Sequence, residues 1–158
     1  MEKICILFTG LQASGKSTFY QQRFPDCVHV NLDTLHTRNK ERLLLKECFD
    51  AGLSFVVDNT NPTRKDRARY IDAAKERGYR VIGYYFQSSI SACKERNSRR
   101  EGKARVPDAA LAAVYCQLEL PVWEEGYDEL YYVRIDQDSF VIEPWKMEEE
   151  EGEDSGEV

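Results

Sequence analysis

Short apolar runs alternate along the chain with longer stretches in which apolar residues recur at helical spacing. The first run, residues 4–8, is apolar at every position, which is typical of a strand covered on both faces. Later runs are rich in β-branched and aromatic residues, and several of them end at an acidic residue. Strands are therefore predicted at residues 4–8, 28–32, 55–57, 81–86 and 130–135.

The intervening stretches carry the start and stop signals of helices. Helices are predicted from Lys16 onward, over residues 37–49 and 64–77, after Ser88-Ser89, and from Pro107 onward. Strands that alternate with helices predict an α/β fold with a mainly parallel, five-stranded sheet and helices on both faces. Ligands of such sheets bind at the carboxyl ends of the strands.

Composition indicates one folded domain over residues 1–147, followed by an acidic tail over residues 148–158. The tail contains seven acidic residues and no basic one, and it is expected to be disordered and solubilising. Without it, 22 basic residues face 21 acidic ones. The first apolar run is far shorter than the ~20 residues of a membrane span. Five cysteines without a C-x-x-C spacing favour free thiols and a cytoplasmic location.

A glycine-rich motif follows the first strand. It reads Gly10-Leu11-Gln12-Ala13-Ser14-Gly15-Lys16-Ser17-Thr18, the G-x-x-x-x-G-K-[ST] pattern between a strand and a helix. Such a loop turns its backbone amides toward phosphate oxygens, and the following helix adds the positive end of its dipole. Lys16 is expected at the β- and γ-phosphates and Ser17 at Mg²⁺. The sequence therefore predicts a P-loop NTPase fold that binds ATP, with nucleotide contacts listed as Gly10, Ala13, Ser14, Gly15, Lys16, Ser17 and Thr18.

The remaining sequence favours phosphate transfer over the other P-loop activities. The D-x-x-G and N-K-x-D motifs of GTPases are missing, and a transporter or remodelling ATPase needs a longer chain. Residues 94–105 carry six basic and two acidic residues. One face of that helix turned inward would place guanidinium groups over a triphosphate, as an arginine-rich lid does. Taken alone, the cluster is better explained as a solvated basic helix face.

Two aspartates follow predicted strands at the same edge of the sheet. Asp33 could accept the proton of an attacking hydroxyl, or it could lie in a turn or cap the next helix, as Thr34 also could. Asp58 could order the metal shell as a Walker-B aspartate does, or it could begin an Asx-turn before Pro62. His29 and His36 lack a third ligand at metal spacing, so no zinc site is expected.

Several motifs together resemble the kinase domain of 5′-hydroxyl polynucleotide kinases, of both the phage type and the animal kinase-phosphatase type. Besides the P-loop, they are residues 30–35 (VNLDTL), Asp58-Asn59-Thr60-Asn61-Pro62 with Arg67-Ala68-Arg69-Tyr70 after it, and Arg96-Asn97-Ser98-Arg99-Arg100 before Val106-Pro107. The resemblance covers about residues 3–135. It implies ATP with Mg²⁺ as donor and a 5′-OH of DNA or RNA as acceptor.

The resemblance also implies roles for single residues. Asp33 resembles the general base, Asp58 the second essential aspartate that acts on the acceptor or the metal, and Arg100 and Arg96 the lid arginines on the ATP phosphates. Phage-type enzymes grip the acceptor with an arginine three residues after the base. This chain has His36 there and Arg38 two residues further on, so either residue is a candidate for that contact.

The sequence thus predicts a kinase in which Asp33, Lys16 and Arg100 are catalytic. Asp33, Asp58 and Arg38 are expected at the acceptor, and Ser17 and Asp58 at the metal. A small-molecule kinase for sugars, nucleosides or nucleotide-sugars is the alternative, favoured by the near-neutral body, and a non-catalytic ATP-gated module is a third reading. No phosphatase motif accompanies the kinase motifs, so a separate phosphatase or ligase partner is possible.

Overall fold

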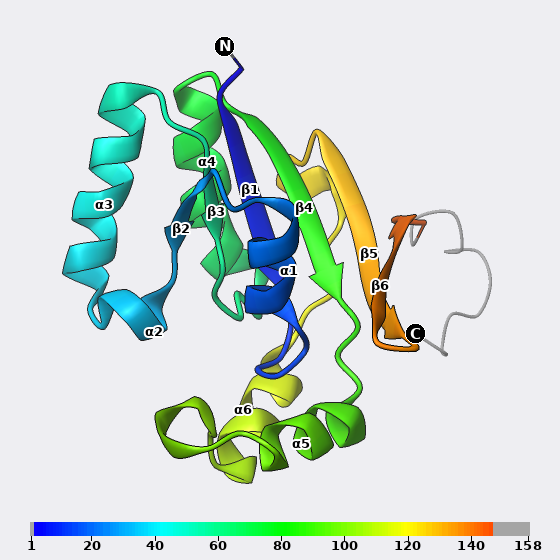
Figure 1. The fold of residues 1–158 in the computed structure, drawn as a ribbon. Coiled ribbons are helices and arrows are strands. Elements are labelled where there is room, and N and C mark those ends of the chain that lie inside the picture. Colours follow the sequence, from blue (N-terminus) through cyan, green and yellow to red (C-terminus); the bar gives the residue numbers. More distant parts are fainter. Residues whose placement is uncertain (1, 147–158) are drawn as a thin grey trace.

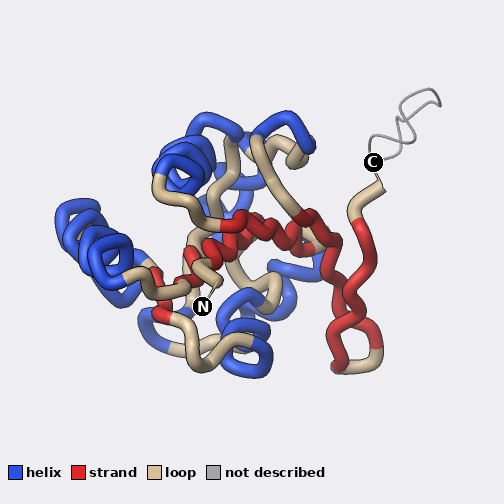
Figure 2. The backbone as a smooth tube through the Cα atoms, turned by 90° about the horizontal axis from the view of Figure 1, so that it is seen from above, coloured by secondary structure: helices blue, strands red, loops and turns tan. Residues whose placement is uncertain are grey.

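The computed structural model describes residues 2–146. Six strands form one twisted sheet in the order β2-β3-β1-β4-β5-β6, and helices cover both of its faces (Figures 1 and 2). Neighbouring strands are parallel except for β5 and β6. The strands are β1 (Ile4–Thr9), β2 (Val28–Val30), β3 (Phe55–Val57), β4 (Arg80–Phe86), β5 (Glu129–Asp136) and β6 (Ser139–Pro144).

The five predicted strands and the mainly parallel sheet are confirmed, and β6 adds an antiparallel strand at the edge. A two-residue turn, Gln137-Asp138, joins it to β5, and both residues have positive φ, 53° and 65°. Such turns normally carry an Asn-Gly or Asp-Gly signal. Because neither glycine nor asparagine stands here, the sequence pattern did not indicate the hairpin.

The helices begin where the sequence predicts them, and three of them begin with a side-chain cap. The hydroxyls of Thr37, Thr63 and Ser89 accept hydrogen bonds from the amides of Lys40, Asp66 and Ala92. The helices are α1 (Lys16–Arg23), α2 (Leu32–Leu35), α3 (Arg38–Ala51), α4 (Arg64–Glu76), α5 (Ile90–Ser98) and α6 (Asp108–Gln117). Two 3₁₀ turns, η1 (Gly102–Ala104) and η2 (Trp123–Glu125), and the single-turn α2 were not predicted.

Alternation along β1 divides the core between the two faces of the sheet. Cys5 and Leu7 face the layer that contains α3 and α4, whereas Ile6 and Phe8 face α1. A third, smaller cluster joins the P-loop to the segment that runs from α5 to α6. The carboxyl ends of β1, β2 and β3 therefore open between these layers, at one end of the sheet (Figure 1).

All five cysteines are free thiols, as expected. The predicted acidic tail, residues 148–158, lies outside the described residues. In the part of the chain that the structure describes, no helix combines the length and apolarity needed to cross a bilayer.

Candidate functional site

A cavity of about 210 Å³ lies at the carboxyl ends of the central strands. It brings together side chains from four separate segments of the chain: the P-loop, α2, the loop after β3, and the end of α5. The residues that line it are Gln12, Ala13, Lys16, Ser17, Asn31, Leu32, Asp33, Asp58, Asn59, Thr60 and Arg100. Of the predicted site residues, Ala13, Lys16, Ser17, Asp33, Asp58 and Arg100 therefore meet in one place.

The remaining predicted residues lie around the cavity and do not line it. Gly10, Ser14, Gly15 and Thr18 belong to the P-loop, which forms one wall. Arg96 lies on α5 and Arg38 at the start of α3.

The backbone of the P-loop requires small residues. A Cβ atom on Gly10 would lie 2.9 Å from Cβ of Phe86 and 3.0 Å from Oγ of Ser14. Gly15 has φ 100° and Ala13 has φ 65°, a left-handed conformation that suits glycine and strains longer side chains. The loop can therefore come close to a ligand with its backbone.

The donors of the loop fit an anionic group. The first backbone bond of α1 runs from the amide of Phe19 to the carbonyl of Gly15, so the amides of the first turn lack helical acceptors. The Ser14 hydroxyl is buried and has no hydrogen-bond partner among the described residues. These are the donors that phosphate oxygens satisfy at a helix N-terminus.

Lys16 is buried in the same wall. Its Nζ atom donates to the carbonyls of Gly10 at 3.1 Å and Leu11 at 2.8 Å. Burial lowers its pKa from 10.5 to about 8, and the negative charge of Asp58 opposes this change. A buried ammonium that is held by carbonyls alone is compensated better when a phosphate lies beside it.

Asp58, Ser17 and His29 form a small polar cluster at the floor of the cavity. The Ser17 hydroxyl donates to Oδ2 of Asp58 at 2.8 Å, and Nε2 of His29 lies 2.7 Å from the same oxygen. The Asp58 side chain is only 1% exposed. Hydroxyl and carboxylate oxygens are the ligands that Mg²⁺ prefers, so Ser17 and Asp58 fit the predicted metal role.

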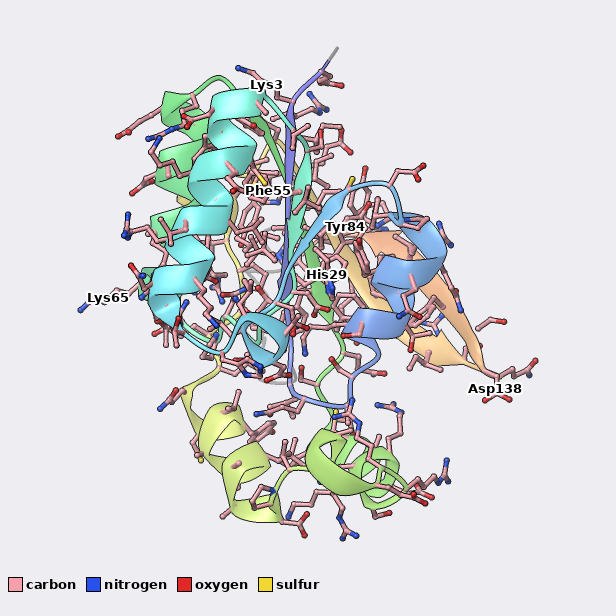
Figure 3. All side chains as sticks on the ribbon, turned by 60° about the vertical axis from the view of Figure 1, so that its left-hand side comes forward. Lys3, His29, Phe55, Lys65, Tyr84 and Asp138 are labelled. Carbon is pink, nitrogen blue, oxygen red and sulfur yellow. The ribbon has the colours of Figure 1, made fainter. Side chains whose placement is uncertain are left out.

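His29 is a member of the site that the sequence analysis missed. Its ring stacks on Tyr20 of α1, with the centroids 4.0 Å apart and the planes 10° apart, and Figure 3 shows it between β2 and α1. The sequence analysis tested it only as a zinc ligand. Among the described residues, no group of three or more His, Cys, Asp or Glu side chains could hold a metal ion.

Asp33 stands on the opposite wall, in the first turn of α2, and its side chain is exposed. The cap of this short helix is Asn31, whose side chain accepts from the amide of Thr34. Neither Asp33 nor Thr34 caps the helix. Within residues 2–146 the Asp33 carboxylate has no hydrogen-bond partner, so it is available to a ligand in the cavity.

A buried network supports the wall that carries Asp33. Asn59 accepts from the amide of Leu32 at 2.9 Å and donates to Glu41 at 3.1 Å. Tyr70 donates to the same Glu41 oxygen at 2.8 Å, and burial next to this carboxylate raises its pKa to about 12. Nη1 of Arg38 donates to Glu41 at 3.0 Å and to Tyr70 at 2.8 Å. The structure thus places Arg38 behind the wall, in this network.

A buried ion pair holds the loop after β3. Arg67 has no exposed surface; its guanidinium bonds both oxygens of Glu125 at 2.9 and 3.0 Å and the carbonyl of Asn61 at 3.0 Å. The Asn61 side chain in turn donates to the carbonyl of Phe8 at 2.8 Å. These contacts fix the position of Asp58 relative to the P-loop.

The two predicted lid arginines have different contacts. Nη1 of Arg96 donates to the carbonyl of Ala13 in the P-loop at 2.6 Å. Arg100 lines the cavity, and its Nη1 donates at 3.0 Å to Ala104 in its own segment. Its remaining donors can therefore reach a ligand.

Comparison with known proteins agrees with this geometry. The family model described as AAA domain matches residues 5–121, and the chain belongs to this family. The chain is 29% identical over 127 residues to a bifunctional polynucleotide phosphatase/kinase of Schizosaccharomyces pombe, a match over 77% of this chain and 31% of the relative. It is 29% identical over 155 residues to a putative bifunctional polynucleotide phosphatase/kinase of Acanthamoeba polyphaga mimivirus, over 92% and 37%. The predicted resemblance to polynucleotide kinases is confirmed.

Other relatives carry different names. An L-seryl-tRNA(Sec) kinase of Methanococcus maripaludis is 23% identical over 78% of this chain and 55% of its own length. Among solved structures, Kti12 of Chaetomium thermophilum in complex with ADP-AlF3 superposes with a TM-score of 0.64 at 17% identity, over 85% of this chain and 90% of that chain. The P-loop kinase fold is therefore confirmed. The chain spans about a third of the length of the two polynucleotide phosphatase/kinases and about half of the tRNA kinase.

Proposed function

We propose that this protein is an ATP-dependent kinase that transfers the γ-phosphate to the 5′-OH end of DNA or RNA. The observation that carries the proposal is the cavity. In it the unpartnered carboxylate of Asp33 faces the P-loop wall with Lys16, while Arg100 reaches in from the turn after α5. A carboxylate across the cavity from the P-loop is placed to take the proton of an acceptor hydroxyl.

Each residue has a defined part in the transfer. Asp33 accepts the proton of the acceptor hydroxyl while the new bond from that oxygen to the γ-phosphorus forms. The bond between the γ-phosphorus and the bridging oxygen breaks, and ADP leaves. Lys16 and Arg100 stabilise the charge that develops on the transferred group. Mg²⁺ held by Ser17 and Asp58 would neutralise the phosphate oxygens, and His29 orients the Asp58 carboxylate.

The nature of the acceptor is supported by the relatives. Two proteins named as polynucleotide phosphatase/kinases match this chain over most of its folded part. The third relative is named as a kinase of a seryl group on tRNA, which is again a hydroxyl on a nucleic acid. A hydroxyl carried by a nucleic acid is therefore a better-supported acceptor than a free sugar or nucleoside.

The test is transfer of label from γ-labelled ATP to oligonucleotides in the presence of Mg²⁺. A 5′-OH oligonucleotide, as DNA and as RNA, is expected to become labelled, whereas the same strand with a 5′-phosphate is not. Label on both strands, or on neither, contradicts the proposal. In the second case, retained ATP binding would move the search to small-molecule hydroxyls.

A further inference from the structure

A groove lined by several basic residues lies between α3 and α4, on the outer side of the Glu41 network. Its volume is about 590 Å³. The residues that line it are Arg38, Glu41, Arg42, Leu45, Lys46, Phe49, Asp50, Arg69, Tyr70, Ala73 and Arg77. We refer to it as the α3–α4 groove.

One end of the groove lies behind the wall that carries Asp33, and the groove runs from there along α3 and α4. At one end Arg38 of α3 contacts Tyr70 of α4, and at the other Arg77, directly after α4, lies 4.4 Å from the ring centre of Phe49 of α3. The two helices therefore run side by side in the same direction, as Figure 1 shows. The first end shares Glu41 and Tyr70 with the network that supports the Asp33 wall. From Arg38 to Phe49 the groove extends about 17 Å along α3.

The charges of the groove are concentrated and partly unpaired. Five basic residues line it against two acidic ones, although the whole folded body is nearly neutral. Arg38 pairs with Glu41 and Lys46 with Asp50. Within residues 2–146, no carboxylate lies in ion-pair range of Arg42 or Arg69. These two guanidinium groups therefore face solvent across the groove without a protein counter-ion.

Leu45, Phe49 and Ala73 form an apolar floor of the groove, and the Arg77 guanidinium lies over the Phe49 ring. Arginine planes and aromatic rings are the surfaces on which unpaired bases stack. A line of basic side chains beside such a floor suits a phosphodiester strand, whose phosphates and bases alternate. A protein partner would have to present a row of acidic residues to match the same charges.

We propose that the α3–α4 groove binds the single-stranded part of the nucleic-acid acceptor beyond its 5′ end, with Arg42 and Arg69 on its phosphates. This inference rests on the proposed function, because it places the acceptor's end nucleotide at Asp33. It explains how a nearly neutral domain holds a polyanion, because basic residues outnumber acidic ones five to two along the groove. It also gives the stacked helices α3 and α4 a role besides covering the sheet.

The test measures binding of a 3′-labelled 5′-OH 12-mer by fluorescence anisotropy, so it does not depend on turnover. The double variant Arg42→Gln/Arg69→Gln removes two phosphate contacts. Each contact changes the slope of log K against log salt by about one. Between 50 and 200 mM salt, wild-type affinity is therefore expected to fall roughly tenfold more than that of the double variant. Arg69→Gln alone is expected to give about half of this change in slope.

The matched control is Arg23→Gln, which removes one exposed charge from the end of α1, on the other face of the sheet. It is expected to leave the affinity and the salt slope unchanged. If Arg23→Gln and Arg69→Gln changed the affinity and the salt slope equally, the proposal would be overturned, because binding would then depend only on the net charge of the protein. Unchanged binding of the 12-mer by the double variant would also overturn the proposal. This holds equally if gel filtration shows that the double variant changes its oligomeric state.

A second readout separates the groove from the catalytic site. The KM for a 5′-OH trinucleotide, too short to fill the groove, is expected to be the same in wild type and double variant, while the KM for the 12-mer rises. An equal rise in KM for the trinucleotide and the 12-mer would mean that the two arginines support the catalytic site, and it would overturn the proposal that the groove binds the acceptor. If no oligonucleotide is phosphorylated, the proposed function fails, and the anisotropy result still decides whether the groove binds nucleic acid.

Discussion

The two sides of the cavity are held in place by different means. The loop after β3 contains the buried Asp58 and Asn61, whose side chains bond to Ser17 and His29 and to the carbonyl of Phe8. Behind it stands the Arg67–Glu125 ion pair. The segment from α5 to α6 is joined to the P-loop by a small apolar cluster and by one bond from Arg96 to Ala13.

This difference follows from what each side does. Asp58 must already be in position when the metal and the phosphates arrive, and a buried carboxylate is tolerable only when its oxygens are satisfied. Arg100 has to respond to a ligand, so most of its donors remain unpaired within the described residues. The loop after β3 is held by a closed hydrogen-bond network, whereas the segment from α5 to α6, which closes on a ligand, has few contacts with the rest of the protein.

The largest expected effect comes from Asp33. It lies on α2, next to the firmly held loop after β3, but its carboxylate has no hydrogen-bond partner within residues 2–146. Asp33→Asn removes the proton acceptor and keeps the shape of the side chain. Turnover is expected to fall by about 10²- to 10⁴-fold. ATP affinity, measured by titration calorimetry, is expected to stay the same because the P-loop wall is untouched. Loss of ATP binding would remove Asp33 from the role of base, and so would unchanged turnover.

Breaking the buried ion pair tests how strongly the fixed side is held. Glu125→Gln leaves the Arg67 charge buried and uncompensated, which costs about 3–5 kcal/mol. The matched control is Glu95→Gln, which removes the carboxylate of an exposed pair with Arg99 on α5, about two-thirds exposed on both sides. That change is expected to cost less than about 0.5 kcal/mol. Urea denaturation measures both, and equal losses would contradict the contrast between the two sides.

Local signals predicted most of the fold and the centre of the site. The P-loop motif and the strand-end aspartates have short-range spacing, so Lys16, Ser17, Asp33 and Asp58 could be placed on one edge before the sheet was known. The edge strand β6 was missed because its turn, Gln137-Asp138, lacks the Asn-Gly or Asp-Gly pair that normally marks such a hairpin.

Long-range contacts could not be predicted in the same way. His29 acquires its role from Tyr20 and Asp58, which are nine and 29 positions away, and Arg67 from Glu125, which is 58 positions away. The basic residues of the α3–α4 groove did show a pattern in the sequence, because Arg38, Arg42 and Lys46 recur every four residues on α3. On its own helix that pattern looks like a solvated face; only the packing of α3 beside α4 turns it into a groove.

Lys16 provides a pH test of the P-loop wall in the absence of nucleotide. Its folded-state pKa of about 8 lies below the usual 10.5, so burial of the charge costs about 3 kcal/mol at neutral pH. This cost is fully present below pH 8 and declines as pH rises toward 10.5, because the unfolded chain then binds more protons than the folded one. Lys16→Met is expected to lose ATP binding and to be more stable than wild type by roughly that amount at pH 7. An equally large difference at pH 10, measured by urea denaturation, would contradict the assignment.

The smallest expected effect concerns the lightly attached side. The buried side chain of Asn97 donates to the carbonyl of Val106 at 2.6 Å and accepts from its amide at 3.0 Å, and so closes the loop that contains Arg100. Asn97→Ala leaves both backbone groups without a partner and costs about 1–3 kcal/mol. Because few contacts connect this segment to the sheet, the loss is expected to appear as faster hydrogen exchange at the Val106 amide and a higher KM for ATP. The denaturation midpoint of the sheet is expected to move little.

The control is Ser98→Ala, at the exposed residue next to Asn97, which should change neither the hydrogen exchange of Val106 nor the KM for ATP. A midpoint shift as large as that of Glu125→Gln would mean that the segment unfolds together with the sheet, and the two sides would then be one cooperative unit.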